Sequence, residues 1–236
     1  MGDLARRALA ELVGTALLVA GIVGSGIAAT QLSPGDVGLQ LLENTMATVG
    51  VLVAIILALG AVSGAHFNPA VTLADRLFGG VTNRDVLAYV PAQIIGGCLG
   101  AIVANVMFEQ PLVALSTKHR ASPAHVFAEV VATFGLLLVI FGVVRSGRAA
   151  VAPFAVGAYI GGGYFFTSST SVANPAVTIG RTLSNTFSGI APASAPAFIV
   201  AQLAGAALAV ACAAVLYPSL RDVAADVVVP HAEEHA

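Results

Sequence analysis

Long apolar runs, separated by short polar stretches, make up most of this sequence. A membrane-spanning helix needs about 20 largely apolar residues, and six runs are long enough. These runs cover residues 9–29, 41–62, 86–108, 123–144, 149–167 and 195–216. The pattern therefore predicts an all-α membrane protein with six transmembrane helices.

Two shorter apolar stretches, at residues 69–79 and 175–186, cannot span a membrane, and both begin inside an Asn-Pro-Ala tripeptide. The first copy is Asn68, Pro69 and Ala70, and the second is Asn174, Pro175 and Ala176. Proline is favoured in the first turn of a helix, because the N–H that it lacks would be unpaired there anyway. Each copy therefore predicts a loop that turns into a short helix. Because such backbone is tolerated at membrane depth only inside protein or beside a water-filled cavity, we expect two re-entrant half-helices.

The two half-helices belong to a longer internal repeat. Glu11 and Glu129 open equivalent spans in Ala-Glu pairs 118 residues apart, and Gln93 and Gln202 mark another pair of spans 109 residues apart. Each copy contains three spans, an odd number, so the second copy must enter the membrane upside down. Inverted repeats of this kind bring their broken helices to a shared site near the midplane. The two Asn-Pro-Ala turns should therefore meet near the centre of the bilayer.

The repeat divides the chain into one membrane domain and a tail. Repeat one covers about residues 1–108, repeat two covers about residues 123–217, and the domain as a whole is residues 1–217. Gly96 and Gly100 in the first copy, like Gly205 in the second, have the small-residue spacing that lets helices approach closely. Residues 218–236 are polar and acidic and are expected to form a cytoplasmic C-terminal tail.

Lysine and arginine in short loops indicate which side faces the cytoplasm, because they are enriched there. With six spans, both termini lie on one side, which carries seven arginines. They are Arg6, Arg7, Arg76, Arg84, Arg145, Arg148 and Arg221. The other side carries Lys118, Arg120 and Arg181. The count predicts that both termini are cytoplasmic.

Composition supports a membrane protein and narrows the class of function. Of the 236 residues, 58% are hydrophobic and 9% are charged, whereas a soluble domain carries about 25% charged residues. The net charge of −2 gives no reason to expect a nucleic-acid partner. Cys98 and Cys212 lie in apolar runs and are read as small buried side chains, not as a disulfide or metal ligands. We expect no metal and no cofactor.

Residues 63–72 read Ser-Gly-Ala-His-Phe-Asn-Pro-Ala-Val-Thr. This stretch, the second Asn-Pro-Ala and the paired Ala-Glu openings resemble the major intrinsic proteins, the family of aquaporin and aquaglyceroporin channels, over essentially the whole chain. The resemblance implies an aquaporin-like fold of six tilted helices and two half-helices. It also implies one pore per subunit and a homotetramer in the lipid bilayer, and a channel in place of an enzyme.

The two halves supply matching residues for such a pore. Asn68 and Asn174 would cap the half-helices and present amide N–H groups to a solute, although a single asparagine at a helix start is usually an ordinary cap. Glu11 and Glu129 either face water at helix ends or accept hydrogen bonds from the re-entrant loops, and the repeat favours the second interpretation. His66 is expected to hold the cytoplasmic loop in shape, with pH-dependent gating as the alternative.

Water-selective members of the family carry an arginine three residues after the second asparagine, where this chain has Val177. Counting back as in the family puts Thr48, Gly162 and Ser171 at the other three positions of the constriction. None of the four is aromatic or charged, which predicts a wide, weakly polar ring. Arg181 lies four residues beyond Val177, about 6 Å further out on the same helix face. It either guards the outer vestibule or lies at the membrane interface.

These features predict a multi-pass protein of the cell membrane that passes small uncharged solutes passively and excludes ions and protons. Water, glycerol-like polyols and neutral arsenous acid are the expected solutes, the last because bacterial members of this wide type are sometimes linked to arsenic handling. An ordinary water-selective channel is the alternative within the family. A secondary transporter, which can also be built on inverted repeats, and a junctional membrane protein with a closed pore are the alternatives from other classes.

Overall fold

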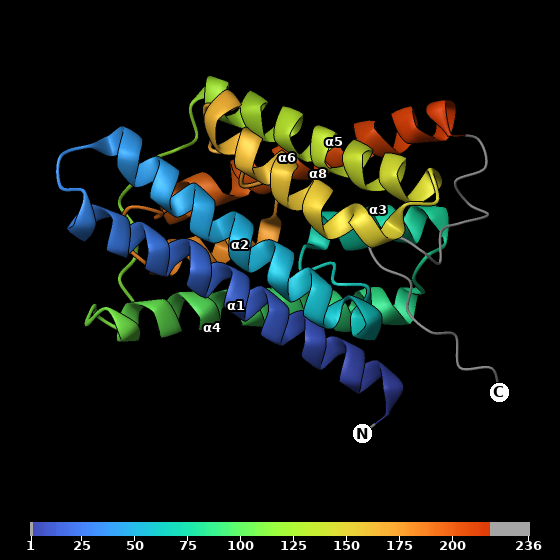
Figure 1. Cartoon of the computed structure of the whole chain (residues 1–236), viewed down its shortest axis with the longest axis horizontal. Coiled ribbons are helices and arrows are strands. Elements are labelled where there is room, and N and C mark those ends of the chain that lie inside the picture. The colour runs from blue at the N-terminus through green and yellow to red at the C-terminus, as the bar shows by residue number, and fades with distance from the viewer. Residues whose placement is uncertain (1, 218–236) are drawn as a thin grey trace.

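The computed structural model of the chain describes residues 2–217 and consists of helices joined by loops (Figure 1). Six helical segments in this part of the chain are long and apolar enough to cross a membrane. They are α1 (Asp3–Leu32), α2 (Val37–Ser63), α4 (Asn83–Met107), α5 (Pro123–Arg145), α6 (Ala152–Phe166) with the preceding 3₁₀ helix η1 (Ala149–Val151), and α8 (Ala195–Leu216) with the preceding η3 (Pro192–Ser194). The predicted all-α membrane fold is confirmed.

Several long helices begin before the apolar runs, because polar residues form their first turns. α1 starts at Asp3, well ahead of the predicted span. The Asp36 side chain accepts a hydrogen bond from the Leu39 N–H at 2.9 Å and caps α2. Thr82 and Asp85 bond each other's backbone N–H groups in a capping box that starts α4. Capped polar turns satisfy the free N–H groups of a helix start, so hydropathy locates the spans but not their ends.

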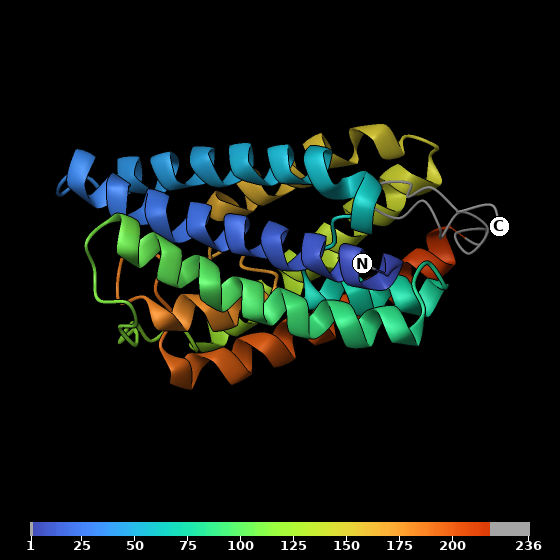
Figure 2. The ribbon, with the colours of Figure 1, turned by 90° about the horizontal axis from the view of Figure 1, so that it is seen from below.

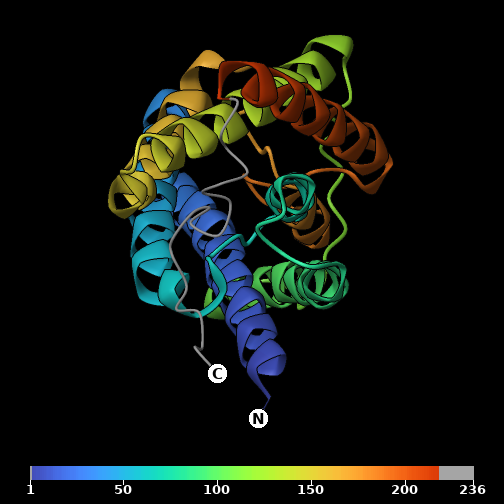
Figure 3. The same cartoon turned by 90° about the vertical axis from the view of Figure 1, so that its right-hand side faces the viewer.

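Two half-helices lie inside the bundle, as the Asn-Pro-Ala pattern predicts. α3 covers Pro69–Phe78 and α7 covers Pro175–Gly180. Figure 2 shows α3 (teal) and α7 (orange) entering from opposite ends of the bundle. Viewed along the bundle in Figure 3, α3 lies in the interior with the long helices around it. The half-helices contact each other, so the two repeats meet inside the molecule.

The second half-helix is shorter than predicted. The sequence suggested a helix over residues 175–186, but α7 ends at Gly180 and one 3₁₀ turn, η2 (Arg181–Leu183), follows. The Thr182 carbonyl oxygen accepts a hydrogen bond from the Ser116 N–H at 3.0 Å. The loop between α4 and α5 therefore binds a backbone group that a longer helix would need for its own hydrogen bonding.

Close helix crossings occur at equivalent places in the two halves. A Cβ atom at Gly96 or Gly100 of α4 would overlap backbone carbonyl oxygens of α1. A Cβ atom at Gly205 of α8 would overlap the Val130 carbonyl oxygen of α5. These two helix pairs pack backbone against backbone, as the small-residue spacing predicts.

Large apolar side chains cover the outside of the bundle. Exposed examples occur on all six long helices, namely Leu17, Leu57, Ile95, Phe127, Phe154 and Val200. Exposed apolar side chains on every long helix are suited to contact with lipid. α1 begins and α8 ends at the same end of the bundle (Figure 2). The predicted tail at residues 218–236, which contains Arg221, lies outside the described residues.

Candidate functional site

The loops that lead into the two half-helices share the same unusual backbone. Ala65 and Phe67 in the first loop have φ angles of 51° and 48°, and Ser171 and Ala173 in the second have φ angles of 52° and 49°. In each loop these residues lie three positions and one position before the asparagine. A left-handed conformation costs a non-glycine residue roughly 1–2 kcal/mol, so contacts from elsewhere must hold both loops in shape.

Glu11 of α1 holds the first loop. Its side chain is fully buried, and its carboxylate accepts hydrogen bonds from the N–H groups of His66 at 3.0 Å and Phe67 at 2.6 Å. The Ser63 hydroxyl and the Gln93 amide donate to the same carboxylate at 2.6 and 2.8 Å. These donors replace the water that a buried carboxylate loses. Glu11 therefore lies deep in the bundle against the loop, not at a helix end facing water.

Glu129 of α5 has the equivalent contacts in the second half. Its carboxylate accepts hydrogen bonds from the N–H groups of Val172 at 3.0 Å and Ala173 at 2.9 Å. The Gln202 amide donates to it at 2.6 Å. Glu129 is fully buried as well, so each loop is fixed by one buried carboxylate from the first helix of its own repeat.

Gln93 and Gln202 connect these carboxylates to the half-helices. Gln93 Nε2 donates a hydrogen bond to the Thr72 hydroxyl, and Gln202 Nε2 donates one to the Thr178 hydroxyl, both at 2.9 Å. Thr72 lies on α3 and Thr178 on α7. The sequence marked these glutamines through the repeated Ala-Gln pair. It did not reveal their role, because their partners are distant along the chain.

Both half-helices begin at the expected prolines, Pro69 and Pro175, and each is capped by the asparagine before it. Asn68 Oδ1 and Asn174 Oδ1 accept hydrogen bonds from backbone N–H groups two residues ahead. The donors are Ala70 at 2.9 Å and Ala176 at 3.0 Å. The capping oxygens leave both amide nitrogens free to point elsewhere.

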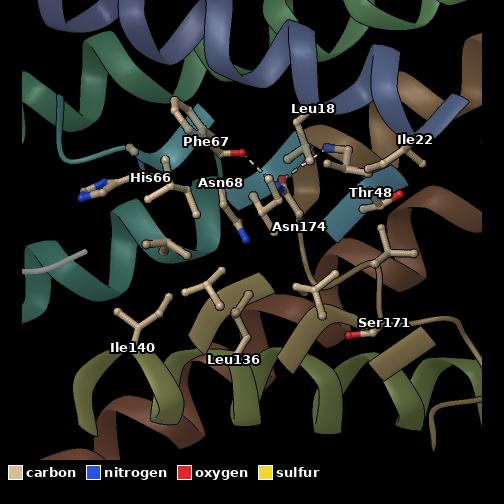
Figure 4. Close-up of a pocket in the computed structure, with 18 of the residues that line it drawn as sticks. Leu18, Ile22, Thr48, His66, Phe67, Asn68, Leu136, Ile140, Ser171 and Asn174 are labelled. Atoms are coloured by element: carbon tan, nitrogen blue, oxygen red, sulfur yellow. Dashed lines mark hydrogen bonds between the residues drawn. The ribbon is translucent and has the colours of Figure 1, made fainter. Parts of the chain in front are cut away.

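The amide nitrogens of the two asparagines reach across to the opposite repeat, and Figure 4 draws the bond between Asn174 and Phe67. Asn68 Nδ2 donates a hydrogen bond to the Ala173 carbonyl oxygen at 2.8 Å. Asn174 Nδ2 donates one to the Phe67 carbonyl oxygen at 2.8 Å. An amide nitrogen carries two N–H bonds, and each asparagine uses one of them to bind the other loop.

A cavity runs past the two asparagines (Figure 4). Twenty residues line it, of which thirteen are apolar. The polar ones are Thr48, His66, Asn68, Tyr164, Ser171, Asn174 and Arg181. In Figure 4, Leu136 and Ile140 form the wall that faces the asparagines, and His66 lies at the opposite end of the view from Ser171. The cavity thus has an apolar wall and a line of polar groups.

Three of the four residues predicted for the constriction line this cavity, namely Thr48, Ser171 and Val177. Gly162 does not. It is exposed on the outer face of α6, where an added Cβ atom would meet no heavy atom within 4 Å. Neighbours two residues away in an α-helix are rotated by about 200°, so a count that is wrong by two residues selects the opposite face of the helix.

Tyr164 occupies the place on α6 that the sequence prediction gave to Gly162. Val156, Ile160 and Tyr164 recur every four residues and line the cavity. Tyr164 Oη lies 3.1 Å from Thr48 Oγ1, within hydrogen-bond distance, and both groups are buried. The four-residue spacing of these large side chains was the available signal, and the adjacent run of glycines concealed it. This part of the cavity is more aromatic than predicted.

Arg181 lines the cavity as well and is buried inside the bundle. It is only 4% exposed, and its Nε–H donates a hydrogen bond to the Ser188 carbonyl oxygen. Burial, followed by the charge of Arg120, lowers the pKa of the Arg181 guanidinium to about 9. Arg181 therefore stays protonated at neutral pH and places a positive charge one turn beyond Val177.

His66 and Asp75 form a buried pair on the first half of the cavity. His66 Nδ1 lies 3.1 Å from the Thr72 hydroxyl, and Nε2 lies 3.5 Å from the Asp75 carboxylate. Asp75 is 1% exposed, and burial, followed by the charge of Asp85, raises the pKa of its carboxyl group to about 8. The imidazole connects the first loop to α3.

The groups along the cavity are suited to passing a neutral solute and not to holding a metal ion. Among residues 2–217, no three His, Cys, Asp or Glu side chains come together in a way that could hold a metal ion. The polar lining consists of amides, hydroxyls, one imidazole and one guanidinium. A small neutral solute can exchange its hydrogen bonds with water for hydrogen bonds with these groups, one after another.

A family profile described as MIP, Major intrinsic protein, matches residues 2–173, well over half of the chain. The chain belongs to the major intrinsic protein family. Aquaglyceroporin AqpS of Rhizobium meliloti (strain 1021) is 50% identical over 209 residues, which are 89% of each of the two chains. The probable aquaporin AqpM of Archaeoglobus fulgidus is 30% identical over 214 residues, covering 79% of this chain and 86% of the relative.

The fold is also that of the family. The structure of the aquaglyceroporin from Plasmodium falciparum matches with a TM-score of 0.65, covering 92% of this chain and 98% of that chain at 20% sequence identity. At that identity the match concerns the fold. As a member of the major intrinsic protein family, the chain is a membrane channel for small neutral solutes and not an enzyme.

Proposed function

We propose that the chain is a passive channel for uncharged solutes larger than water, with water also passing. Glycerol-like polyols are the main class, and neutral arsenous acid is a further one. The observation that carries the proposal is the two-sided lining, in which the asparagine amides face the apolar Leu136 and Ile140 (Figure 4). A polyol can turn its hydroxyl groups to the amides and its C–H groups to the apolar wall. The name of the AqpS relative, an aquaglyceroporin, supports the same class.

The selectivity ring that we propose consists of Thr48, Tyr164, Ser171 and Val177. Val177 stands where water-selective members of the family carry arginine, and it supports a pore that admits more than water. Arg181 favours the alternative, an ordinary water-selective channel, because its buried charge lies beside the same cavity. The ratio of glycerol flux to water flux decides between these two functions.

Exclusion of ions and protons follows from the direction of the two half-helices. α3 and α7 both begin at the asparagines, so their N-terminal ends point at one place. Each end carries about half a positive charge. Together, at ~4 Å and an effective dielectric constant of ~20, they oppose a monovalent cation by on the order of 4 kcal/mol. A neutral solute does not meet this barrier.

We place the channel in the cell membrane with both termini in the cytoplasm. Of the nine lysines and arginines among the described residues, six belong to the side that carries the termini and three to the other side, which supports this orientation. The homotetramer is proposed from family membership. The apolar outer surface of the bundle leaves room for both lipid and subunit contacts.

Flux measurements on the full chain in proteoliposomes test the proposal. Light scattering after an osmotic jump should show water and glycerol flux well above that of empty vesicles, and arsenous acid uptake should rise in parallel. Because a channel needs no alternating access, flux should be linear in the solute gradient and unaffected by a protonophore. Water flux without glycerol flux would establish the water-selective alternative. Saturation at low concentration, together with loss of flux in a protonophore, would establish a secondary transporter.

A further inference from the structure

Three basic side chains gather at the end of the bundle opposite the start of α1 and the end of α8, which we call the outer mouth: Lys118, Arg120 and Arg181. Lys118 and Arg181 bind adjacent carbonyl groups of one loop. Lys118 Nζ donates a hydrogen bond to the Phe187 carbonyl oxygen at 3.0 Å, and Arg181 Nε donates one to the carbonyl oxygen of Ser188. These two cations therefore share one segment of the outer mouth.

Arg120 lies against the second loop of the outer mouth. Its Nη1 is 3.4 Å from both the Ser169 carbonyl oxygen and the Thr170 hydroxyl. The next residue, Ser171, lines the cavity. Arg120 thus rests on the rim of the cavity that Arg181 enters, and its charge contributes to the lowered pKa of Arg181.

The three cations of the outer mouth are not neutralised by ion pairs with any described residue. Within residues 2–217, the ion pairs join Arg6, Arg7 and His66 to acids at the other end of the bundle, and none involves the three outer cations. Glu129 is the acid whose charge reaches Arg120 and Arg181. Its buried carboxylate already accepts hydrogen bonds from the second loop and from a glutamine. Asp36, Glu43 and Glu109 lie at the same end of the bundle but form no ion pair with the three cations.

The Arg181 guanidinium has donors to spare. A guanidinium carries five N–H donors, and among the described residues only its Nε–H has an acceptor. The side chain is nevertheless almost fully buried and lines the cavity. A buried charge without a partner is costly. The remaining donors, directed at a space that a ligand can enter, would be satisfied by an anion.

We propose that Arg181, supported by Arg120 and Lys118, forms a binding site for small tetrahedral oxyanions of the phosphate and sulfate class, and that the bound anion obstructs solute flux. The planar fork of a guanidinium matches two oxygens of such an anion. The anion stops at Arg181, because most of the lining beyond it is apolar and cannot replace the water around a charge. The positive ends of the half-helices attract the anion, but this attraction is much weaker than the free energy needed to remove water from the anion.

Binding is measured first, by equilibrium dialysis of radiolabelled sulfate against the full chain in detergent. We expect saturable binding of one sulfate per chain. Arg181→Gln should weaken binding by about tenfold or more, the scale of one charge-assisted hydrogen bond. Arg120→Gln should weaken it less. The matched control is Arg145→Gln, an exposed arginine at the other end of the bundle, which should leave binding unchanged.

Obstruction is measured next, in proteoliposomes, with glycerol flux compared in sodium sulfate and sodium chloride at equal ionic strength on both sides of the membrane. Wild-type flux should fall saturably with sulfate, each variant being normalised to its own flux in chloride. Arg181→Gln should need about tenfold more sulfate for the same fractional loss. This measurement rests on the proposed function, whereas dialysis does not. If vesicles with the wild-type protein show no glycerol flux, the proposed function is refuted. The oxyanion site is then judged from the dialysis measurement alone.

Two outcomes would overturn the site itself. One is the absence of saturable sulfate binding to the wild-type protein. The other is equal binding by the wild type, Arg181→Gln and Arg120→Gln. If Arg181→Gln does not fold, as judged by gel filtration, Arg120→Gln carries the test, and unaltered binding by that variant then counts against the site. Sulfate binding without any effect on flux would refute obstruction alone.

Discussion

At the scale of single residues, a few side chains of the cavity lining form the selectivity ring that we propose. Val177 and Ser171 are small, whereas Tyr164 and Arg181 bring an aromatic ring and a charge to the same cavity. Side-chain volume limits the size of a solute, and the number of hydrogen-bond donors sets how well its water can be replaced. Substitutions at these positions should therefore change selectivity more than they change stability.

Val177→Arg should convert the channel toward water selectivity. The longer side chain adds bulk and five N–H donors at a buried position in the lining. We expect glycerol and arsenous acid flux to fall by about tenfold or more, a barrier of about 1.4 kcal/mol or higher, while water flux stays within a few-fold. Light scattering in proteoliposomes measures both. Val177→Met, which adds volume without charge, is the matched control. Unchanged glycerol flux in Val177→Arg would mean that residue 177 lies beside a wide part of the pore.

Asp75 makes the stability of the channel depend on pH. Its pKa is raised from 3.8 to about 8, so between these values the folded protein holds a proton that the unfolded chain has released. The stability linked to this proton is fully present below pH 4 and is lost as pH rises through about 8. Thermal unfolding in detergent should therefore show that Asp75→Asn stabilises the protein more at pH 8.5 than at pH 5.

If the effect of Asp75→Asn on stability changes with pH in the opposite direction, Asp75 has a different charge state. His66 Nε2 lies 3.5 Å from the Asp75 carboxylate. If Asp75→Asn destabilises the protein most where histidine is protonated, Asp75 is ionised and paired with an imidazolium. Asp36→Asn, at an exposed helix cap, is the control for effects of charge alone.

At the scale of the elements, each re-entrant loop depends on a carboxylate from the first helix of its repeat. The loops contain left-handed residues, which are unfavourable on their own. Glu11 and Glu129 offset this by accepting backbone N–H groups from the strained segments. Each half-helix is thus positioned by the first long helix of its own repeat, which lies well before it in the sequence.

Glu129→Gln should loosen the second loop. The substituted amide keeps one acceptor oxygen but turns an NH₂ group toward donors that previously met a carboxylate. We expect a loss of about 3 kcal/mol in stability, typical of breaking hydrogen bonds to a charged group, measured by thermal unfolding in detergent. Glu109→Gln changes an exposed carboxylate in the same way and should have little effect. Equal stability of the two variants would show that Glu129 does not hold the loop.

Glycines of the long helices can be separated into those that pack against a neighbouring helix, such as Gly100 of α4, and those that do not, such as Gly162 of α6. Gly100→Ala would push a Cβ atom into the Ala16 carbonyl oxygen and separate α1 from α4. Overpacking of this kind costs about 2 kcal/mol. Gly162→Ala meets nothing within 4 Å and should be neutral within about 0.5 kcal/mol. If Gly162→Ala reduces glycerol flux without a loss of stability, Gly162 faces the pore after all.

At the scale of the whole molecule, two inverted halves create a positive region in the middle of an apolar bundle. The N-terminal ends of both half-helices are brought together by Asn68 and Asn174. The ion barrier that we propose needs no lysine or arginine, because the backbone supplies its positive charge. Its strength depends on both halves at once.

Asn174→Asp should let cations leak. The carboxylate cancels part of the positive potential and cannot donate to the Phe67 carbonyl oxygen. Decay of an imposed pH gradient in proteoliposomes should be faster than for the wild type, and Asn68→Asp should behave alike. Asn185→Asp, in an exposed loop, is the control and should hold the gradient. Gradients that decay at the wild-type rate in both lumen variants would refute the role of the half-helix ends.

The sequence predicts the spans and the paired turns because each depends on local pattern. Apolar runs of sufficient length, prolines after asparagines and the repeat are all visible along the chain. The residues that line the cavity are harder to predict, because the rotation of each helix about its axis decides which side chains point inward. Gly162 and Tyr164 show this. The inward position of Arg181 depends on a turn closed by the distant Ser116 N–H. Contacts between residues far apart in sequence had no local signal.

The crossed hydrogen bonds of Asn68 and Asn174 bear on how the chain is made. The ribosome delivers the first half before the second, so Asn68 waits in the bilayer without the Ala173 carbonyl oxygen that it binds in the finished protein. The first half alone lacks the partners of its buried polar groups, so folding must end with the two halves packing against each other. The same reciprocity means that two copies of one ancestral half, inserted in opposite orientations, would satisfy each other's asparagines. Duplication and fusion of a single gene would then have joined a pair of chains that already fitted.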